Sequence, residues 1–387
     1  MKISKFIFSA VAIACVAVAC TKERKLSIQN PPVPGVDMPI GKDEAYYQKL
    51  REWKASDHTL TYVYYAAWAP LEGASSLYIE YQNLAPRLIN LPDSLDIVNL
   101  WMGTPSNDPE DGYNYSPYAW SDMKYAQQVK GIKFVMHADA SHYGQVVDLI
   151  DPDTFEFVID DQTGKPKQVT VSANDAESIR AYARYNVYIV NKCGLDGVDY
   201  DYEGWGADQI TTVIKETGRY FGAQADEELP GAYPEKLVIV DYWSATPPQT
   251  LKPYVDYVVR QAYSQQAGLN SHSQLGGPGW LAKSKYIICE QYNQGSGAQL
   301  NYLNGGKKWS DPAVNENGEE IYSLEAYARY CMKGQAKGFG AYYIDKDVDN
   351  GTDALRQKGY KGTFENYAFL RRAIQIANPA GAYTGEE

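Results

Sequence analysis

Histidine and cysteine are scarce in this chain of 387 residues, which has only four histidines and five cysteines. Three of the cysteines, Cys193, Cys289 and Cys331, lie beyond residue 20, an odd number without the close spacing of a zinc site. The sequence therefore argues against a disulfide framework and predicts buried thiols. We expect neither a metal nor another cofactor.

Positive charge and long hydrophobic runs are also scarce. The chain has 36 Lys and Arg against 48 Asp and Glu, which gives a formal net charge of −12. Such an acidic chain is a poor candidate for binding nucleic acid, and we expect no nucleic-acid partner. After residue 20, no stretch is long and apolar enough to predict a transmembrane helix.

The first twenty residues, MKISKFIFSAVAIACVAVAC, have the layout of a cleaved export signal: two lysines, a short apolar run and small residues before Cys20. The ending AVAC resembles a bacterial lipobox, in which the cysteine becomes the lipid-carrying first residue. Cys15 is a second candidate, and an ordinary secretory signal with a chance cysteine is the alternative. We expect residues 1–19 to form the signal peptide and Cys20 to be the lipidation site.

Residues 20–42 include the sequence NPPVPG and are predicted to form an extended tether behind the lipid. The protein would then be an exported bacterial lipoprotein of the cell envelope, on the outer membrane or cell surface, held to the membrane only by its lipid. Loss of Lys2 and Lys5 with the signal peptide changes the net charge from −12 to −14.

Strand-like runs recur along the rest of the chain, with helical periodicity between most of them. The eight runs cover residues 59–68, 95–103, 132–140, 195–204, 236–245, 254–264, 285–293 and 339–347. Eight strands alternating with helices predict a single α/β domain over residues 43–387, a closed (β/α)8 TIM barrel.

Three helices are predicted with some detail. The clearest one has Asn174 as its N-cap and stops at Gly194, another runs from about residue 323 to before Gly338, and a final one covers about residues 366–377. The segment TPPQTLKP between the fifth and sixth strands leaves little room for a helix.

Functional residues of such a barrel lie at the carboxyl ends of the strands. Polar or aromatic residues stand at these ends, namely Trp68, Trp101, Asp139, Glu203, Trp243, Tyr263, Tyr292 and Asp345.

The fourth run, LDGVDYDYEG, carries four acids within ten residues. Side chains alternate across a strand, so Asp199, Asp201 and Glu203 share one face, while apolar or aromatic residues share the other. Strands of a covered parallel sheet are buried on both faces, which predicts that the acids point into the barrel. Closely spaced carboxylates then raise at least one pKa. The alternative is structural: buried Arg, Tyr or backbone donors, or a metal, satisfy the acids.

Residues 196–203, DGVDYDYE, resemble the DGxDxDxE signature of family 18 glycoside hydrolases at the end of the fourth barrel strand. The resemblance implies that Glu203 donates a proton to the glycosidic oxygen. It implies that Asp201 orients and stabilises the 2-acetamido group of the substrate, and that Asp199 is its buried partner. Asp196 has the opposite parity and is interpreted as structural.

The chemistry of that family explains the spacing. The acetamido carbonyl of the sugar attacks the anomeric carbon, so no enzyme nucleophile is needed. A neutral Glu203 must therefore lie beside an anionic Asp201, and neighbouring carboxyls with separated pKa values meet that need.

A tyrosine at the end of the sixth strand binds the acetamido group in this family, often with a polar residue two positions earlier. Gln261 and Tyr263 occupy those places and share a face of the strand. The resemblance therefore implies a catalytic role for Tyr263 and substrate contact for Gln261.

The sequence also departs from the chitinases of the family. It has HADASH at 137–142 where they have a Gly-rich turn, and AYYIDKD at 341–347 where they have a floor tryptophan. The pattern is closer to the endo-β-N-acetylglucosaminidase branch, which cuts the β-1,4 GlcNAc-GlcNAc core of N-glycans; a chitin-type substrate is the alternative. Tyr343 or Tyr342 is expected to replace the floor ring.

Other residues are candidates for lining the pocket. Trp68, Trp101 and Trp243 can stack on sugar faces, although core packing explains each of them as well. Glu290, Tyr292, Asp345 and the loop 293–299 are candidates for shaping the subsites. His137, Asp139 and His142 are interpreted as pocket lining rather than metal ligands, because the chain has only four histidines and no supporting cluster.

Two kinds of function remain open. One is a glycosidase, and the other is a surface glycan-binding protein on the same barrel, like family members that have lost activity. Such relatives commonly replace the acid, whereas Glu203 and Asp201 are both present here, which favours the enzyme. We expect a GlcNAc-containing glycan or glycoprotein as the partner, and a monomer.

Overall fold

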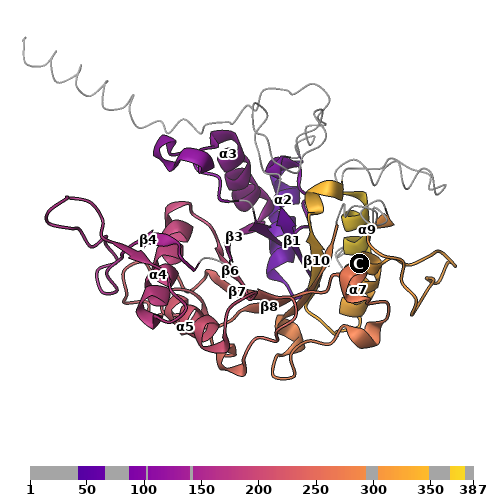
Figure 1. Cartoon of the computed structure of the whole chain (residues 1–387). Helices are drawn as coiled ribbons and strands as arrows, with labels where there is room; N and C mark the ends of the chain where they lie inside the picture. The colour runs from indigo at the N-terminus through magenta and orange to yellow at the C-terminus, as the bar shows by residue number, and fades with distance from the viewer. Residues whose placement is uncertain are drawn as a thin grey trace, which may run out of the picture. The chain divides into compact units, whose positions relative to one another are not determined.

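The structure is a computed structural model that describes residues 42–65, 87–101, 103–139, 143–292, 304–347 and 367–379. Eight parallel strands close into a barrel in the order β1-β10-β9-β8-β7-β6-β3-β2 (Figure 1). They are β1 Leu60–Tyr65, β2 Ile97–Leu100, β3 Lys133–Asp139, β6 Gly197–Asp201, β7 Leu237–Tyr242, β8 Tyr257–Gln261, β9 Tyr286–Gln291 and β10 Gly338–Tyr342. Each falls within or directly beside one of the eight predicted runs, so the predicted (β/α)8 barrel is confirmed.

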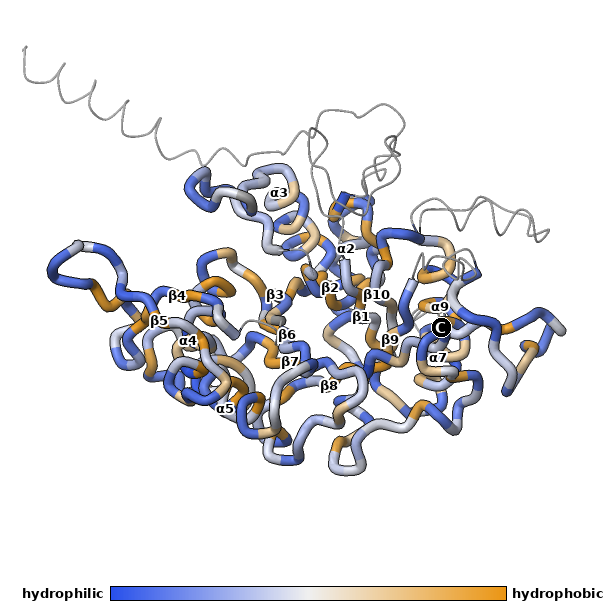
Figure 2. The backbone as a smooth tube through the Cα atoms, viewed as in Figure 1, coloured by the Kyte–Doolittle hydropathy of each residue, from blue (hydrophilic) through white to orange (hydrophobic). Residues whose placement is uncertain are grey.

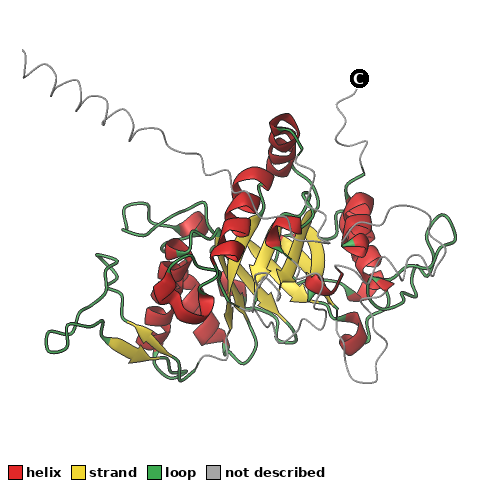
Figure 3. Ribbon diagram, turned by 90° about the horizontal axis from the view of Figure 1, so that it is seen from above, coloured by secondary structure: helices red, strands yellow, loops and turns green. Residues whose placement is uncertain are grey.

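Helices surround the strands, as Figure 3 shows from above. They are α2 Glu44–Ala55, α3 Pro117–Tyr125, α4 Ala176–Lys192, α5 Ala207–Thr217, α6 Ser264–Ala267, α7 Ser323–Met332 and α9 Ala368–Ala377. Helices α4 and α5 lie side by side outside β6 and β7, and α7 and α9 lie outside β10.

Short helical turns complete the connections. They are η1 Leu88–Asn90, η2 Pro109–Asn114, η3 Ala126–Lys130, η4 Gly222–Gln224, η5 Gln249–Leu251, η6 His272–Gln274, η7 Lys283–Lys285 and η9 Ile344–Asp347. A small antiparallel sheet of β4 Val146–Asp148 and β5 Gln168–Thr170 projects between β3 and α4. Figure 2 shows that hydrophilic residues concentrate in the outlying loops, such as those beyond this small sheet.

The predicted start of α4 was wrong by one residue. Its N-cap is Asp175 rather than Asn174, because the Asp175 carboxylate accepts a hydrogen bond of 3.0 Å from the Glu177 backbone N–H. Between β7 and β8, the short turn η5 stands where the sequence left little room for a helix.

Alternation along the strands divides the core into two parts. Inward side chains fill the barrel, among them Tyr62, Tyr64, Ile239 and Cys289. Outward side chains form a larger core against the helices. Gly340 is required at the closing seam, because a Cβ atom there would lie 1.5 Å from the Tyr62 carbonyl oxygen.

The three cysteines beyond residue 20 are free and buried, as the sequence predicted. Within the described residues, no helix is long and apolar enough to cross a membrane.

Candidate active site

A cavity of about 440 Å³ lies at the carboxyl ends of the barrel strands. It brings together residues of β1, β3, β6, β7, β8 and β10 with residues that follow β2, β6, β7 and β8. The lining consists of Tyr64, Trp101, His137, Asp201, Glu203, Asp241, Trp243, Gln261, Tyr263, Gln266 and Tyr342. Eight of the eleven are residues that the sequence had predicted for the pocket, namely Trp101, His137, Asp201, Glu203, Trp243, Gln261, Tyr263 and Tyr342.

The acids on β6 and directly after it lie at decreasing depth along the chain. Asp199 is fully buried inside the barrel, Asp201 is half-buried at the cavity floor, and Glu203 is exposed at its mouth. Tyr200 points the opposite way and hydrogen-bonds Thr217 on α5 at 2.7 Å. This contact fixes the face of the strand that turns inward, so the carboxyls cannot rotate out of the barrel together.

Asp199 is held by donors from two other strands. Tyr62 on β1 donates a hydrogen bond of 2.5 Å to Asp199 Oδ2, and Asn99 on β2 donates one of 2.8 Å to the same oxygen. Burial raises the pKa of Asp199 to about 6, against the lowering effect of these donors. The carboxyl can therefore gain or lose a proton near neutral pH.

Asp241 is a further carboxyl of the site that was not singled out from the sequence. It lies on β7, is 1 % exposed, and accepts a hydrogen bond from the Tyr64 hydroxyl. Burial, followed by the nearby charges of Asp201 and Asp199, raises its pKa well above the ordinary range. The sequence could have indicated it, because Asp241 stands two residues before the candidate Trp243 and therefore shares a face of the strand with it.

Strand β8 delivers two groups to the cavity. Gln261 Nε2 donates a hydrogen bond of 3.1 Å to Asp201 Oδ1, and Tyr263 lines the cavity beside it. The backbone around Tyr263 is held on both sides. Tyr327 donates to the carbonyl of Ala262, and the Ser264 N–H donates to Glu290 Oε1 at 3.0 Å.

Glu290 therefore supports the site from behind. It is completely buried, does not line the cavity, and also accepts a hydrogen bond from the Ser264 hydroxyl. This places Glu290 among the residues that fix the Tyr263 backbone rather than among those that line the cavity.

Aromatic rings form one wall of the cavity. The ring of Tyr342 lies 5.0 Å from Trp101 and 6.0 Å from Tyr263, between ring centroids, and Tyr263 lies 5.2 Å from Trp243. Edge and stacked contacts at these distances are favourable for aromatic rings. Tyr342 therefore lines the cavity, whereas Tyr343 packs behind it, 4.0 Å away.

The structure does not bring Tyr292 and Asp345 to the cavity lining. Tyr292 is fully buried in the outer core because its parity is opposite to that of the inward residue Cys289. Asp345 is buried on η9, where its charge acts on Tyr65 and Tyr367.

Several predicted residues lie outside the described part of the chain. These are Cys20, Trp68, His142 and the loop 293–299, and the side chain of Asp139 is likewise not described.

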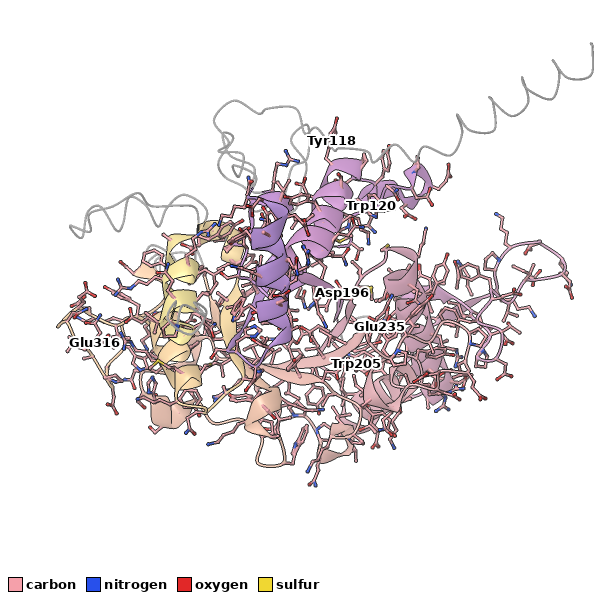
Figure 4. The ribbon with its side chains drawn as sticks, turned by 180° about the vertical axis from the view of Figure 1, so that it is seen from behind. Tyr118, Trp120, Asp196, Trp205, Glu235 and Glu316 are labelled. Atoms are coloured by element: carbon pink, nitrogen blue, oxygen red, sulfur yellow. The ribbon has the colours of Figure 1, made fainter. Side chains whose placement is uncertain are left out.

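Asp196 has the structural role that its parity indicated. Its Oδ2 accepts hydrogen bonds from Gln127 Nε2 at 2.7 Å and from the Phe134 N–H at 2.8 Å. Figure 4 labels Asp196, which directly precedes β6. This carboxylate ties β6 to the start of β3, at the end of the barrel opposite the cavity.

A second hollow of about 360 Å³ meets the first at His137, which lines both. Its lining includes Ser106, Gln145, Tyr185 and Asn186, which carry hydroxyl or amide groups. His137 is thus shared by the cavity at the strand ends and by a hollow beside α4.

The family model described as "Glycoside hydrolase family 18, BT1044-like" matches residues 23–294 of the chain. No curated protein sequence matches this chain.

Solved structures share the fold at low sequence identity. An endo-β-N-acetylglucosaminidase from Cordyceps militaris has a TM-score of 0.54 and 18% identity, covering 88% of this chain and 97% of that one. A mutant of that enzyme in complex with fucosyl-N-acetylglucosamine-Asn has a TM-score of 0.53 and 19% identity, with the same coverage of both chains. A Glu→Gln variant of BT1044 has a TM-score of 0.56 and 20% identity, covering 88% of this chain and 94% of that one.

Proposed function

Because the chain belongs to glycoside hydrolase family 18, we propose that it is an endo-β-N-acetylglucosaminidase cleaving the β-1,4 GlcNAc-GlcNAc linkage of the N-glycan core. One observation carries the proposal. Asp201, Glu203 and the Gln261–Tyr263 pair converge on a single cavity, and Gln261 is hydrogen-bonded to Asp201.

In the proposed mechanism, Glu203 begins as the neutral acid. It gives its proton to the glycosidic oxygen while the acetamido oxygen of the substrate forms a bond to the anomeric carbon. The bond to the leaving sugar breaks, and a positively charged oxazolinium ring forms. Water then adds to the anomeric carbon from the side that the leaving sugar vacated and gives a proton to the Glu203 carboxylate. The bond between the anomeric carbon and the acetamido oxygen breaks, the neutral acetamido group re-forms, and the β configuration is retained.

Asp201 is the group that stabilises the charged ring. As an anion at the cavity floor, it would face the acetamido nitrogen, whose positive charge grows in the transition state. Tyr263 would hold the acetamido oxygen beneath the anomeric carbon, which is a contribution of positioning.

Two observations support an N-glycan over a linear chitin chain. The second hollow, which meets the cavity at His137, offers room for a branch of the glycan. The fold is shared with a Cordyceps militaris endo-β-N-acetylglucosaminidase, a mutant of which was crystallised with fucosyl-N-acetylglucosamine-Asn. The runners-up are a chitinase-type hydrolase and a glycan-binding protein without activity.

The test is incubation with high-mannose, hybrid and complex N-glycoproteins and, separately, with chitooligosaccharides. Mass spectrometry of the products should show released glycans with one GlcNAc at the reducing end and one GlcNAc left on the protein. Cleavage of chitooligosaccharides alone would favour the chitinase. Binding without cleavage of any of these substrates would favour the glycan-binding protein.

We propose further that the protein is a monomer and an exported lipoprotein with its lipid on Cys20. The support is the AVAC sequence at positions 17–20. Cys20→Ala should move the protein from the membrane fraction to the soluble fraction and abolish labelling by a fatty-acid analogue. Unchanged labelling would point to Cys15 or to another means of attachment. Sedimentation of a form starting at residue 43 would test the monomer.

A further inference from the structure

Asp201 and Asp241 lie side by side on the adjacent strands β6 and β7. They are Cα partners in the parallel pairing of β6 with β7, and both side chains reach the cavity. The backbone locks this pairing further, because the Tyr202 N–H donates to the Asp241 carbonyl oxygen at 2.8 Å. Two carboxyl groups therefore lie side by side, one 1 % exposed and the other half-buried.

The two oxygens of Asp241 have different surroundings. Oδ2 accepts a hydrogen bond from the Tyr64 hydroxyl. Oδ1 is buried and has no hydrogen-bond donor among the residues that the structure describes. A negative charge on Asp241 would be poorly compensated at Oδ1 and would repel Asp201, and an uncompensated buried charge is costly.

A neutral acid fits these surroundings. Its carbonyl oxygen, Oδ2, accepts from Tyr64, and its hydroxyl, Oδ1–H, is free to donate to a carboxylate oxygen of Asp201. Asp201 would then receive hydrogen bonds from two sides, from Gln261 on β8 and from Asp241 on β7. Two donors hold the plane of a carboxylate more firmly than one, and both favour its charged form.

We propose that Asp241 is a positioning residue that, as the neutral acid, donates a hydrogen bond to Asp201 and keeps that carboxylate charged and oriented towards the substrate. The role of Asp201 rests on the proposed function. The raised pKa of Asp241, caused by burial and by the charges of Asp201 and Asp199, agrees with this assignment. The other titratable groups near Asp241 are Tyr62, Tyr64, Tyr263 and Cys289.

Asparagine and alanine at position 241 separate the possibilities. In Asp241→Asn, the amide oxygen can accept from Tyr64 and the amide nitrogen can donate to Asp201, as the neutral acid does. We expect Asp241→Asn to lower kcat by less than about tenfold. Asp241→Ala, which leaves Asp201 without this donor, should lower it about 10²-fold or more with little change in KM. Asp161→Asn, on an exposed turn, is the control.

Two kinetic outcomes would overturn the proposal. Equal large losses in Asp241→Asn and Asp241→Ala would mean that a charged Asp241 is required. A wild-type kcat in folded Asp241→Ala would mean that Asp241 serves only the packing of the barrel. Circular dichroism and the denaturation midpoint establish whether each variant is folded.

Infrared spectroscopy tests the proton without any turnover. The difference spectrum between wild type and Asp241→Asn at neutral pH should contain the carbonyl stretching band of a protonated carboxylic acid. Its absence would overturn the proposal. Because this measurement needs no substrate, it distinguishes failure of the Asp241 assignment from failure of the proposed function.

Discussion

Gln261 Nε2 donates a hydrogen bond of 3.1 Å to Asp201 Oδ1, which joins the sixth barrel strand to the fourth. Tyr263, two residues further along, reaches the cavity from the same side of the chain. One strand therefore fixes the carboxylate at the cavity floor and also presents a hydroxyl-bearing ring to the substrate. Because Gln261 and Tyr263 are only two residues apart, the strand fixes the spacing of their side chains, which suits a site that must hold a substrate group in one orientation.

Replacement of Glu203 tests the acid. Glu203→Gln keeps the size of the side chain but cannot donate the proton, so kcat should fall by at least about 10²-fold while glycan binding persists. Initial rates on a released-glycan assay and calorimetry of binding would measure both. The matched control is Glu235→Gln, an exposed acid away from the cavity (Figure 4). Wild-type turnover in Glu203→Gln would remove this residue from the mechanism.

Replacement of Tyr263 separates substrate positioning from packing. The ring packs between Trp243 and Tyr342, so Tyr263→Phe keeps these contacts and removes only the hydroxyl. We expect kcat to fall by about 10²-fold, or 2–4 kcal/mol, with a smaller change in KM. Tyr118→Phe, at a tyrosine 53 % exposed, is the control. Unaltered kinetics in Tyr263→Phe would leave Tyr263 as a packing residue.

The stereochemistry of the product tests substrate assistance. If the acetamido group is the nucleophile, the first product has the β configuration, and a thiazoline mimic of the cyclic intermediate inhibits far better than free GlcNAc. Proton NMR during the first minutes and inhibition constants provide the readouts. An initial α product would exclude this mechanism.

The protonation of Asp199 affects stability. Its pKa rises from 3.8 to about 6 on folding, so the native state binds more protons than the unfolded state between these values. The contribution of Asp199 to the stability of the wild type should therefore fall, by on the order of 2 kcal/mol, as the pH rises from 4 to 7. In Asp199→Asn, the amide oxygen can still accept from Tyr62, and this loss is absent.

The measurement is urea denaturation of both proteins at several pH values. The difference in free energy of unfolding between Asp199→Asn and wild type should grow in favour of the variant over this window. Asp161→Asn, at an exposed position, should show no such trend. A constant difference from pH 4 to pH 7 would contradict the raised pKa.

Tyr327 is predicted to stabilise the strand end at Tyr263. Tyr327→Phe removes the donor to the Ala262 carbonyl oxygen and leaves that buried acceptor unpaired, which should cost about 1–3 kcal/mol. Because Ala262 precedes Tyr263, kcat should also fall, by less than in Tyr263→Phe. Tyr330→Phe, three residues along α7, is the control for denaturation and kinetics. A variant as stable as wild type would show that the hydrogen bond contributes nothing.

The sequence predicted the barrel and the acid row because both depend on local periodicity. Alternating side chains identified the strands, and the same period set Asp199, Asp201 and Glu203 on one face. The donors Tyr62 and Tyr64 were not predicted, since β1 has tyrosines on both faces and nothing local shows which of them meet β6 and β7. Asp241 was missed for the same reason: its partner Asp201 becomes visible only from the register between strands. Tyr292 was predicted to line the pocket because it stands at a strand end. The alternation of side chains along β9 instead places it on the outer face of the strand.

The hydrogen bonds from β1 to the buried acids have a consequence for the order of folding. Tyr62 and Asp199 are 137 positions apart, and Tyr64 and Asp241 are 177 apart, so these contacts form only when the first strand has met the middle of the chain. Contacts of such long range carry a large loop-closure entropy and form late. Local helices such as α4 can appear early, whereas the carboxyls lack their donors until the ring of strands is complete. In a refolding experiment, catalytic activity should therefore return later than the helical circular dichroism signal. The time at which activity returns would then measure closure of the barrel.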